Sequence, residues 1–195
     1  MTTSCDDQPI ARLPAVTLLD VAIKNGLRPL LLAGRRLLPI VQGGMGVGVS
    51  AHRLAGSVAR EGAFGTIASV DLRHHHPDLM ERTASLPIGH QSKIVIDAAN
   101  LEALSREIRM ARQIANGLGL LAVNVMRAVS EYAASVRMAL ECGIDAVVVG
   151  AGLPLDLPDL AKDYPQVLLI PILSDARGIQ LVVKKWERKG RIPGA

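Results

Sequence analysis

Hydrophobic and polar positions follow two different rhythms along the chain. Short continuous apolar runs predict buried β-strands, and they alternate with segments whose apolar positions recur every three or four residues, as in amphipathic helices. The expected strands cover residues 37–41, 63–70, 120–125, 146–149 and 167–173. This alternation predicts a parallel sheet built from βα units.

The helical segments carry start and stop signals. A short helix from Pro14 is expected to end at Gly26, and Ser50 is expected to cap a helix that ends at Gly62. Asp97 is expected to cap a long helix. The expected inward positions of the three later helices are Leu101, Leu104, Ile108, Ala111 and Ala115; Tyr132, Ala133, Val136, Ala139 and Leu140; and Ile179, Val182, Val183 and Trp186.

The rhythm breaks between Asp71 and Lys93, where two prolines and the run His74-His75-His76 occur. Neighbouring side chains diverge, and no Cys, Asp or Glu stands at a familiar ligand spacing. A surface loop is therefore favoured over a metal site, and we expect these histidines to be structural.

Four glycines lie within six residues, in the segment Gln42-Gly43-Gly44-Met45-Gly46-Val47-Gly48. Glycines at this density let the backbone turn sharply and approach another group closely. An apolar run, a glycine-rich turn and a helix start together form a cradle for a phosphate or a flat cofactor ring. Two alternatives are a tight connector and a dinucleotide fingerprint, although the glycine spacing fits G-x-G-x-x-G poorly.

Composition narrows the function classes. Nearly half of the residues are hydrophobic (49%), but only 2% are aromatic, which argues against a stacking surface for single-stranded nucleic acid. The net charge of +4 favours anionic ligands. The two cysteines form no disulfide framework, and neither a secretory signal nor a membrane-spanning run is recognisable. We therefore expect a cytoplasmic protein that binds neither nucleic acid nor membrane.

In parallel α/β sheets, ligands bind beyond the carboxyl ends of the strands. Residues 42–46, Asn124, residues 150–152 and Ser174 all lie at the carboxyl ends of expected strands. Their common location predicts one shared site. Asn124 taken alone could equally satisfy local backbone groups.

Several segments, in order, resemble one family. They are Leu30–Gly48, which contains Pro39-Ile40-Val41-Gln42-Gly43-Gly44-Met45; Leu121–Met126; Val148–Pro154; and Ile170–Arg177. Together they resemble the nitronate monooxygenase (2-nitropropane dioxygenase) family, which are FMN-dependent TIM barrels that oxidise alkyl nitronates with O2. The resemblance implies an α/β fold of the parallel (β/α) TIM-barrel type, with FMN as cofactor and a small nitronate as substrate.

The resemblance also implies site residues. Gln42, Gly43, Gly44, Met45 and Gly46 would approach the flavin. Asn124 would lie beneath it. Gly150 and Ala151 would open the substrate side, and Ser174 would line the pocket. Met126 stands where some members carry a hydroxyl residue.

The chain departs from the family at its C-terminal end. Only about five of the eight βα units of a closed barrel are expected, and a barrel needs about 250 residues. The family's catalytic histidine and its phosphate-binding loops would lie beyond the C-terminus, so no catalytic residue is assigned. We expect an N-terminal extension and helix (1–26) and a partial FMN-binding barrel (27–195), inactive by itself, with exposed sheet edges that favour homo-oligomers.

Other interpretations remain open at this stage. They are a non-catalytic α/β module, a truncated product, and a protein resembling flavin-dependent enoyl reductases.

Overall fold

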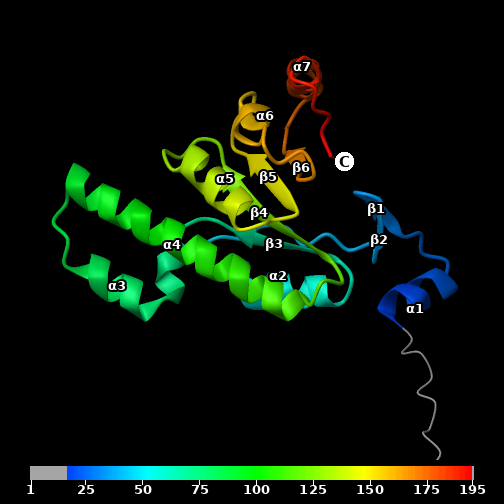
Figure 1. Ribbon diagram of the computed structural model, residues 1–195, viewed down its shortest axis with the longest axis horizontal. Coiled ribbons are helices and arrows are strands. Elements are labelled where there is room, and N and C mark those ends of the chain that lie inside the picture. Colours follow the sequence, from blue (N-terminus) through cyan, green and yellow to red (C-terminus); the bar gives the residue numbers. More distant parts are fainter. Residues whose placement is uncertain (1–16, 195) are drawn as a thin grey trace, which may run out of the picture.

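The computed structural model describes residues 17–194, in which helices and strands alternate (Figure 1). The helices are α1 (Leu18–Lys24), α2 (His52–Arg60), α3 (Pro77–Ala84), α4 (His90–Ala115), α5 (Tyr132–Glu141), α6 (Leu157–Leu160) and α7 (Ala176–Glu187), and η1 (Leu72–His75) is a short 3₁₀-helix. The strands are β1 (Leu30–Leu32), β2 (Arg35–Leu37), β3 (Phe64–Ala68), β4 (Leu120–Met126), β5 (Ala146–Gly150) and β6 (Leu168–Pro171).

Strands β3, β4, β5 and β6 form a parallel sheet whose spatial order is their order along the chain. Beside β3, Val41 forms a parallel bridge with Phe64. At the opposite edge the Gly194 N–H donates to the carbonyl of Leu169, at 2.9 Å. Within residues 17–194 the sheet does not close, so the fold is α/β, of the parallel TIM-barrel type, with an incomplete barrel.

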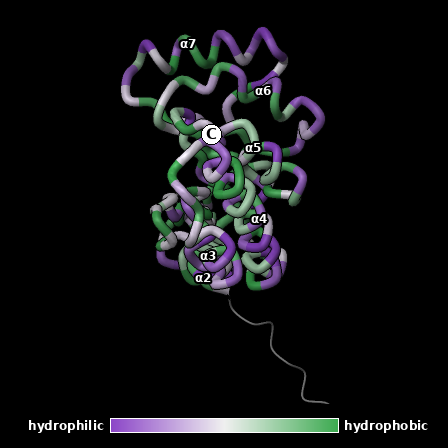
Figure 2. The backbone as a smooth tube through the Cα atoms, turned by 90° about the vertical axis from the view of Figure 1, so that its left-hand side faces the viewer, coloured by the Kyte–Doolittle hydropathy of each residue, from purple (hydrophilic) through white to green (hydrophobic). Residues whose placement is uncertain are grey.

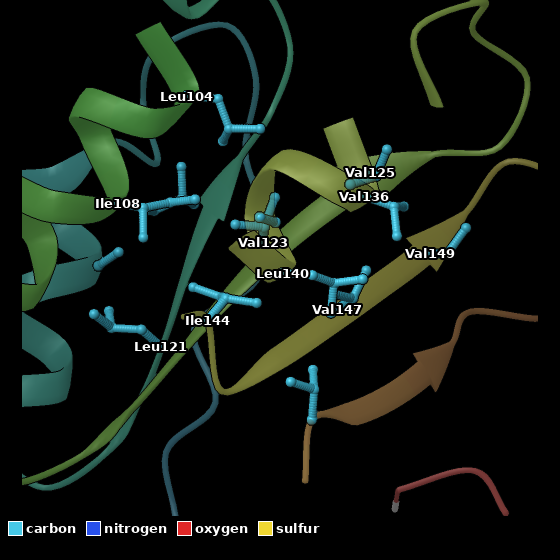
Figure 3. Packing of buried hydrophobic residues seen from close by; sticks show 14 of the residues in the cluster. Leu104, Ile108, Leu121, Val123, Val125, Val136, Leu140, Ile144, Val147 and Val149 are labelled. Carbon is cyan, nitrogen blue, oxygen red and sulfur yellow. The ribbon is translucent and has the colours of Figure 1, made fainter. Parts of the chain in front are cut away.

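The outer face of the sheet packs against helices α2, α4 and α5 (Figures 1 and 3). Alternate residues of a strand point to opposite faces, so Leu121, Val123 and Val125 of β4 enter this core. Glycine allows the close approach of α2 to β3, because a Cβ at Gly65 would lie 2.0 Å from the carbonyl oxygen of Ala55. This layer holds the larger hydrophobic core.

A smaller cluster lies on the inner face, where a closed barrel has its interior. It consists of Leu37, Phe64, Leu120, Ala122, Ala146 and Val148. Asn124 points to the same side as Ala122, two residues earlier in β4. The inner face therefore presents apolar walls with an amide among them.

The helices are amphipathic, and purple and green alternate along α4 and α7 in Figure 2. On α7, Val182 and Trp186 are completely buried, and the Trp186 indole donates to the carbonyl of Pro154 at 3.0 Å. The expectation for Ile179 was wrong, because its side chain is 49% exposed. It lies on the first turn of α7, one turn before the buried Val182.

The first expected strand is only partly formed. Leu37 ends β2, which pairs with β1 in an antiparallel hairpin, and Val41 alone bridges to β3. Pro39 interrupts the run because it has no N–H to donate to a ladder.

Two expected helix caps were wrong. Ala51 occupies the N-cap position of α2, and Ser50 bonds within the glycine segment instead. The long helix α4 begins at His90, so Asp97 lies inside it and pairs with Lys93 one turn earlier, at 2.7 Å. The part of the first helix expected before residue 17 lies outside the described residues; α1 begins after Thr17, whose side chain forms a capping box.

The expected surface loop between Asp71 and Lys93 was also wrong. The segment forms η1 and α3 before α4 begins, and Pro77 occupies the first turn of α3, where its missing N–H costs nothing. His74 and His75 are exposed, whereas His76 is buried.

Candidate functional site

A cavity of about 420 Å³ opens on the inner face near the carboxyl ends of the strands. This volume lies within the range of about 300–1,000 Å³ that is usual for small-molecule and cofactor sites. Apolar side chains form most of its wall, and polar groups come from Gln42, Thr66 and Asn124. The other lining residues are Leu30, Leu32, Val41, Gly43, Gly44, Phe64, Val148, Ile170, Ile172 and Gly194. We call it the inner cavity.

Ser50 fixes the glycine loop, by which we mean residues 43–49. Its completely buried hydroxyl accepts from the Met45 N–H at 2.9 Å and donates to the Gly43 carbonyl at 3.1 Å. Its backbone N–H donates to the Met45 carbonyl at 2.9 Å, and its carbonyl accepts from Ala68 of β3, also at 2.9 Å. A single serine therefore closes the loop upon itself and attaches it to the sheet.

The side chain of Gln42 continues the sheet. Its carbonyl oxygen accepts from the Thr66 N–H at 2.8 Å, and its amide nitrogen donates to the Thr66 carbonyl at 3.0 Å. The same nitrogen lies 2.8 Å from the Ser50 hydroxyl. The amide of Gln42 is thus engaged by the chain itself, and its role at this site is to hold the loop against β3.

Two glycines of this segment are required by protein contacts. A Cβ at Gly44 would lie 2.5 Å from Cβ of Asn124, and one at Gly48 would lie 1.9 Å from Nε2 of His75. Gly48 also has a positive φ of +73°, which disfavours other residues. A side chain at Gly44 would therefore collide with Asn124 before it met any ligand in the cavity.

The side-chain amide of Asn124 accepts and donates no hydrogen bond within residues 17–194. Its backbone carbonyl accepts from the Ser69 N–H at 3.0 Å. Because the amide borders the inner cavity beside Gly44, its hydrogen-bonding capacity is available to a ligand there.

A second cavity of about 670 Å³ lies beyond the ends of β5 and β6 and shares Ile172 with the inner cavity. Ala151, Gly152 and Ser174 line it, together with Asp175 and Arg177. We call it the outer cavity. The expected site residues therefore divide: Gln42, Gly43, Gly44 and Asn124 border the inner cavity, Ala151 and Ser174 border the outer one, and Met45, Gly46 and Gly150 border neither.

Comparison with known families gives a match over residues 34–189, to the model described as nitronate monooxygenase. The chain belongs to the nitronate monooxygenase family. No curated protein matches it in sequence. Among solved structures, it is similar to FabK from Thermotoga maritima and to the M276A mutant of that protein, each with a TM-score of 0.52 and 20% identity.

The similarity covers 78% of this chain but only 38% of FabK and 40% of the mutant. The chain thus spans well under half the length of these structures. At this identity the likeness concerns the fold, and it supports the TIM-barrel type of this nitronate monooxygenase family member.

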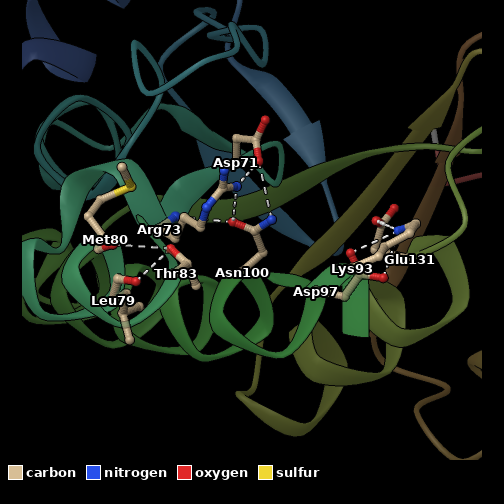
Figure 4. A network of polar contacts seen from close by, with 9 residues as sticks. All are labelled: Asp71, Arg73, Leu79, Met80, Thr83, Lys93, Asp97, Asn100 and Glu131. Atoms are coloured by element: carbon tan, nitrogen blue, oxygen red, sulfur yellow. Dashed lines mark hydrogen bonds and ion pairs between the residues drawn. The ribbon is translucent and has the colours of Figure 1, made fainter. Parts of the chain in front are cut away.

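A polar rim lies beside the carboxyl ends of β3 and β4 (Figure 4). Lys93 on α4 contacts Asp97 at 2.7 Å and Glu131 at 2.5 Å. Burial raises the pKa of Asp97, and its hydrogen bond with Glu131 raises it further. Burial opposes the charge of Glu131 as well, but hydrogen bonds with Asp97 and Lys93 outweigh it and lower the pKa of Glu131 to about 2.

A neighbouring set of contacts fixes the turn after β3. The Asn100 side chain accepts from the Arg73 N–H at 3.2 Å and donates to Asp71 at 3.3 Å, and the Arg73 guanidinium pairs with Asp71 (Figure 4). These contacts join the carboxyl end of β3 to α4. They also place η1 beside the glycine loop.

Sequence reasoning missed three features of this family member's site. They are the loop-closing role of Ser50, the pairing of Thr66 with Gln42, and the burial of Glu107 beside two histidines. Of these residues, only Ser50 could have been noticed in the sequence, because it follows the glycine-rich segment. That position suggested a helix cap rather than a loop closure.

The part of the chain that the structure describes has no helix long and apolar enough to cross a membrane. Residues 17–194 also hold no group of three His, Cys, Asp or Glu side chains placed to bind a metal ion.

Proposed function

We propose that this chain supplies the flavin-ring side of an FMN-dependent nitronate monooxygenase, in which an alkyl nitronate is oxidised with O2. The observation that carries the proposal is the inner cavity, where the glycine loop and the free amide of Asn124 meet. Membership of the nitronate monooxygenase family supports a flavin-dependent oxidoreductase.

The inner cavity suits a flat ring better than a phosphate. Val41, Phe64 and Val148 offer apolar surface to the ring, and the Asn124 amide can bond its polar edge. No Lys or Arg lines the inner cavity, so residues 17–194 offer no charged grip for a phosphate there. When bound, FMN would accept electrons from the substrate and pass them to O2.

The outer cavity is the proposed substrate side. Arg177 places a positive charge on its wall and Ser174 a hydroxyl, both suited to the anionic oxygens of a nitronate, while Asp175 lines the same cavity. The shared Ile172 separates this polar wall from the apolar inner cavity. A nitronate there would lie next to a ring in the inner cavity.

Proton transfer has no residue assigned to it. None of the chain's five histidines lines either cavity. Among the described residues, Asp175 is the one carboxylate that lines the outer cavity, and its Oδ1 already accepts from the Gly178 N–H at 2.8 Å. No proton transfer is therefore assigned to it, and the chain's own part is to bind and orient.

Titration of the 195-residue chain with FMN, and separately with riboflavin, tests the proposal through the change in flavin fluorescence. We expect both to bind with similar affinity, because the contacts are made to the ring. Asn124→Leu should weaken binding about ten-fold, the equivalent of about 1.4 kcal/mol. Gln113→Leu, which replaces an exposed amide on α4, is the matched control.

The absence of binding by either flavin would favour the non-catalytic α/β module. Oxygen uptake with an alkyl nitronate and added FMN should stay at background for this chain alone. Sustained turnover would show that this chain supplies a general base that the proposal does not assign.

A further inference from the structure

The histidines between β3 and α3 have no part in the function proposed above, although one of them meets a buried acid. Glu107 on α4 has a completely buried side chain. Its Oε2 accepts from the His52 backbone N–H at 2.7 Å and lies 2.8 Å from Nδ1 of the same residue. Its Oε1 lies 3.1 Å from Nε2 of His76, an ion-pair separation without hydrogen-bond geometry.

This arrangement joins three separate elements. His52 begins α2, directly after the glycine loop; His76 follows η1; and Glu107 lies in the middle of α4. A buried carboxylate without partners is strongly disfavoured, so these contacts hold all three elements in one arrangement.

The glycine loop lies between the parts that Glu107 connects. Its last glycine, Gly48, packs against the His75 ring, because a Cβ there would lie 1.9 Å from Nε2. Ser50, two residues before His52, closes the loop through Met45. The loop is therefore followed in the chain by His52, and it contacts His75, the residue directly before His76.

We propose that Glu107 is a positioning residue for the glycine loop, acting through His52 and His76. The carboxylate fixes the start of α2 and the segment after β3 relative to each other, and thereby the shape of the loop between them. Its consequence for flavin binding rests on the function proposed above, whereas its effect on the loop does not.

The charge and the two oxygens of Glu107 are both needed. A glutamine has the same shape but only one accepting oxygen, so it cannot serve His52 and His76 in the same way. Glu107→Gln should therefore leave the chain folded but lose its contact with either His52 or His76.

Hydrogen–deuterium exchange followed by mass spectrometry, without flavin, tests the proposal in the full chain. In Glu107→Gln, amides of residues 43–52 and 71–76 should exchange about ten-fold faster, whereas amides of β4 and β5 keep their protection. His76→Gln, which removes a single partner, should affect the same two segments less. Glu102→Gln, at a partly exposed glutamate of α4 paired with Arg82 and Arg106, is the control and should change neither segment.

Uniformly faster exchange across the sheet and the loop would overturn the proposal, since Glu107 would then contribute only to global stability. Unchanged exchange in Glu107→Gln would overturn it too. If Glu107→Gln does not fold, His76→Gln decides alone, by the same pattern. A parallel FMN titration separates the positioning role of Glu107 from the proposed flavin-binding function. If the wild-type chain binds no flavin, the proposed function fails while the exchange result still stands.

Discussion

On the outer face of the sheet, Leu121, Val123 and Val147 are completely buried beneath helices (Figure 3). On the inner face, Val41 is 60% exposed and Ile172 is 53% exposed, although both are as apolar as the residues opposite. The difference lies in what covers each face. The outer core is complete within residues 17–194, whereas the inner face borders a cavity.

The larger packed core and the proposed binding site therefore lie on different sides of the same strands. Neighbouring residues of β4 serve different purposes: Val123 fills the outer core, and Asn124 borders the cavity. Large apolar patches that stay exposed usually mark a site of interaction. Substitutions on the two faces should accordingly differ in which property they change.

The largest difference is expected between two isoleucines. Ile108→Ala on α4 removes a completely buried side chain and should lower the free energy of unfolding by about 2–5 kcal/mol. Ile172→Ala, at a half-exposed position between the two cavities, should cost less than about 1 kcal/mol, because little packing is lost. Urea denaturation of both variants measures the two losses in the free energy of unfolding. Equal losses would mean that the inner face contributes to the core as much as the outer face.

A smaller effect is expected from two adjacent glycines of the inner face. Gly44→Ala would bring a Cβ within 2.5 Å of Asn124 and should cost about 3 kcal/mol through overpacking. Gly43→Ala meets no atom within 4 Å, so it should leave the free energy of unfolding nearly unchanged. Thermal denaturation compares the two.

The same pair tests the flavin proposal. Gly43→Ala should weaken FMN binding although the fold is intact, if the loop backbone approaches the ring. Unchanged binding would place the ring away from Gly43.

Removing the Ser50 hydroxyl should cost about 2 kcal/mol, since the Met45 N–H and the Gln42 amide lose a buried acceptor. Ser105→Ala is the control. This serine of α4 is also buried, and its hydroxyl forms no hydrogen bond within residues 17–194. A similar loss in both variants would show that Ser50 matters for packing rather than for closing the loop.

The smallest effect on stability is expected from Glu131 in the polar rim, which is part of neither face of the sheet. The lowered pKa of Glu131 means that its charged form stabilises the fold above about pH 4.5, and that this contribution disappears as the pH falls toward about 2. Because the group is partly exposed, the contribution should stay below about 1 kcal/mol. Midpoints of thermal unfolding at pH 3 and pH 7 should therefore differ less in Glu131→Gln than in the wild-type chain. An equal difference in both would exclude Glu131 as a source of acid sensitivity.

The sequence predicted those parts of the fold that depend on local patterns. The apolar runs of β4 and β5 and the glycine after α5 lie where expected, because a strand buried on both faces has a recognisable composition. The start of α4 was missed because Ile94 and Val95 are exposed on its first turns, which hides the helical period.

The candidate site was less predictable, since its contacts join distant positions. Glu107 looks like one more charged residue of a solvated helix until His52 and His76, which come from other elements, surround it. Ser50 follows the glycines, but nothing in the order of residues distinguishes a helix cap from a loop closure. The placement of Gln42, Gly44 and Asn124 at one cavity was anticipated from the strand ends. Their binding of flavin remains a prediction.

The sequential order of β3, β4, β5 and β6 has a consequence for synthesis on the ribosome. Each strand finds its partner in the strand made just before it, so the sheet can grow from its N-terminal side while the chain is still being translated. The growing edge always belongs to the newest strand, and it is protected only when the next βα unit arrives. In the described sheet β6 forms one edge, and the Gly194 N–H donates to the Leu169 carbonyl there. A pause in translation should therefore matter most directly after a new strand has formed, when the edge of that strand is the part of the sheet most open to wrong partners.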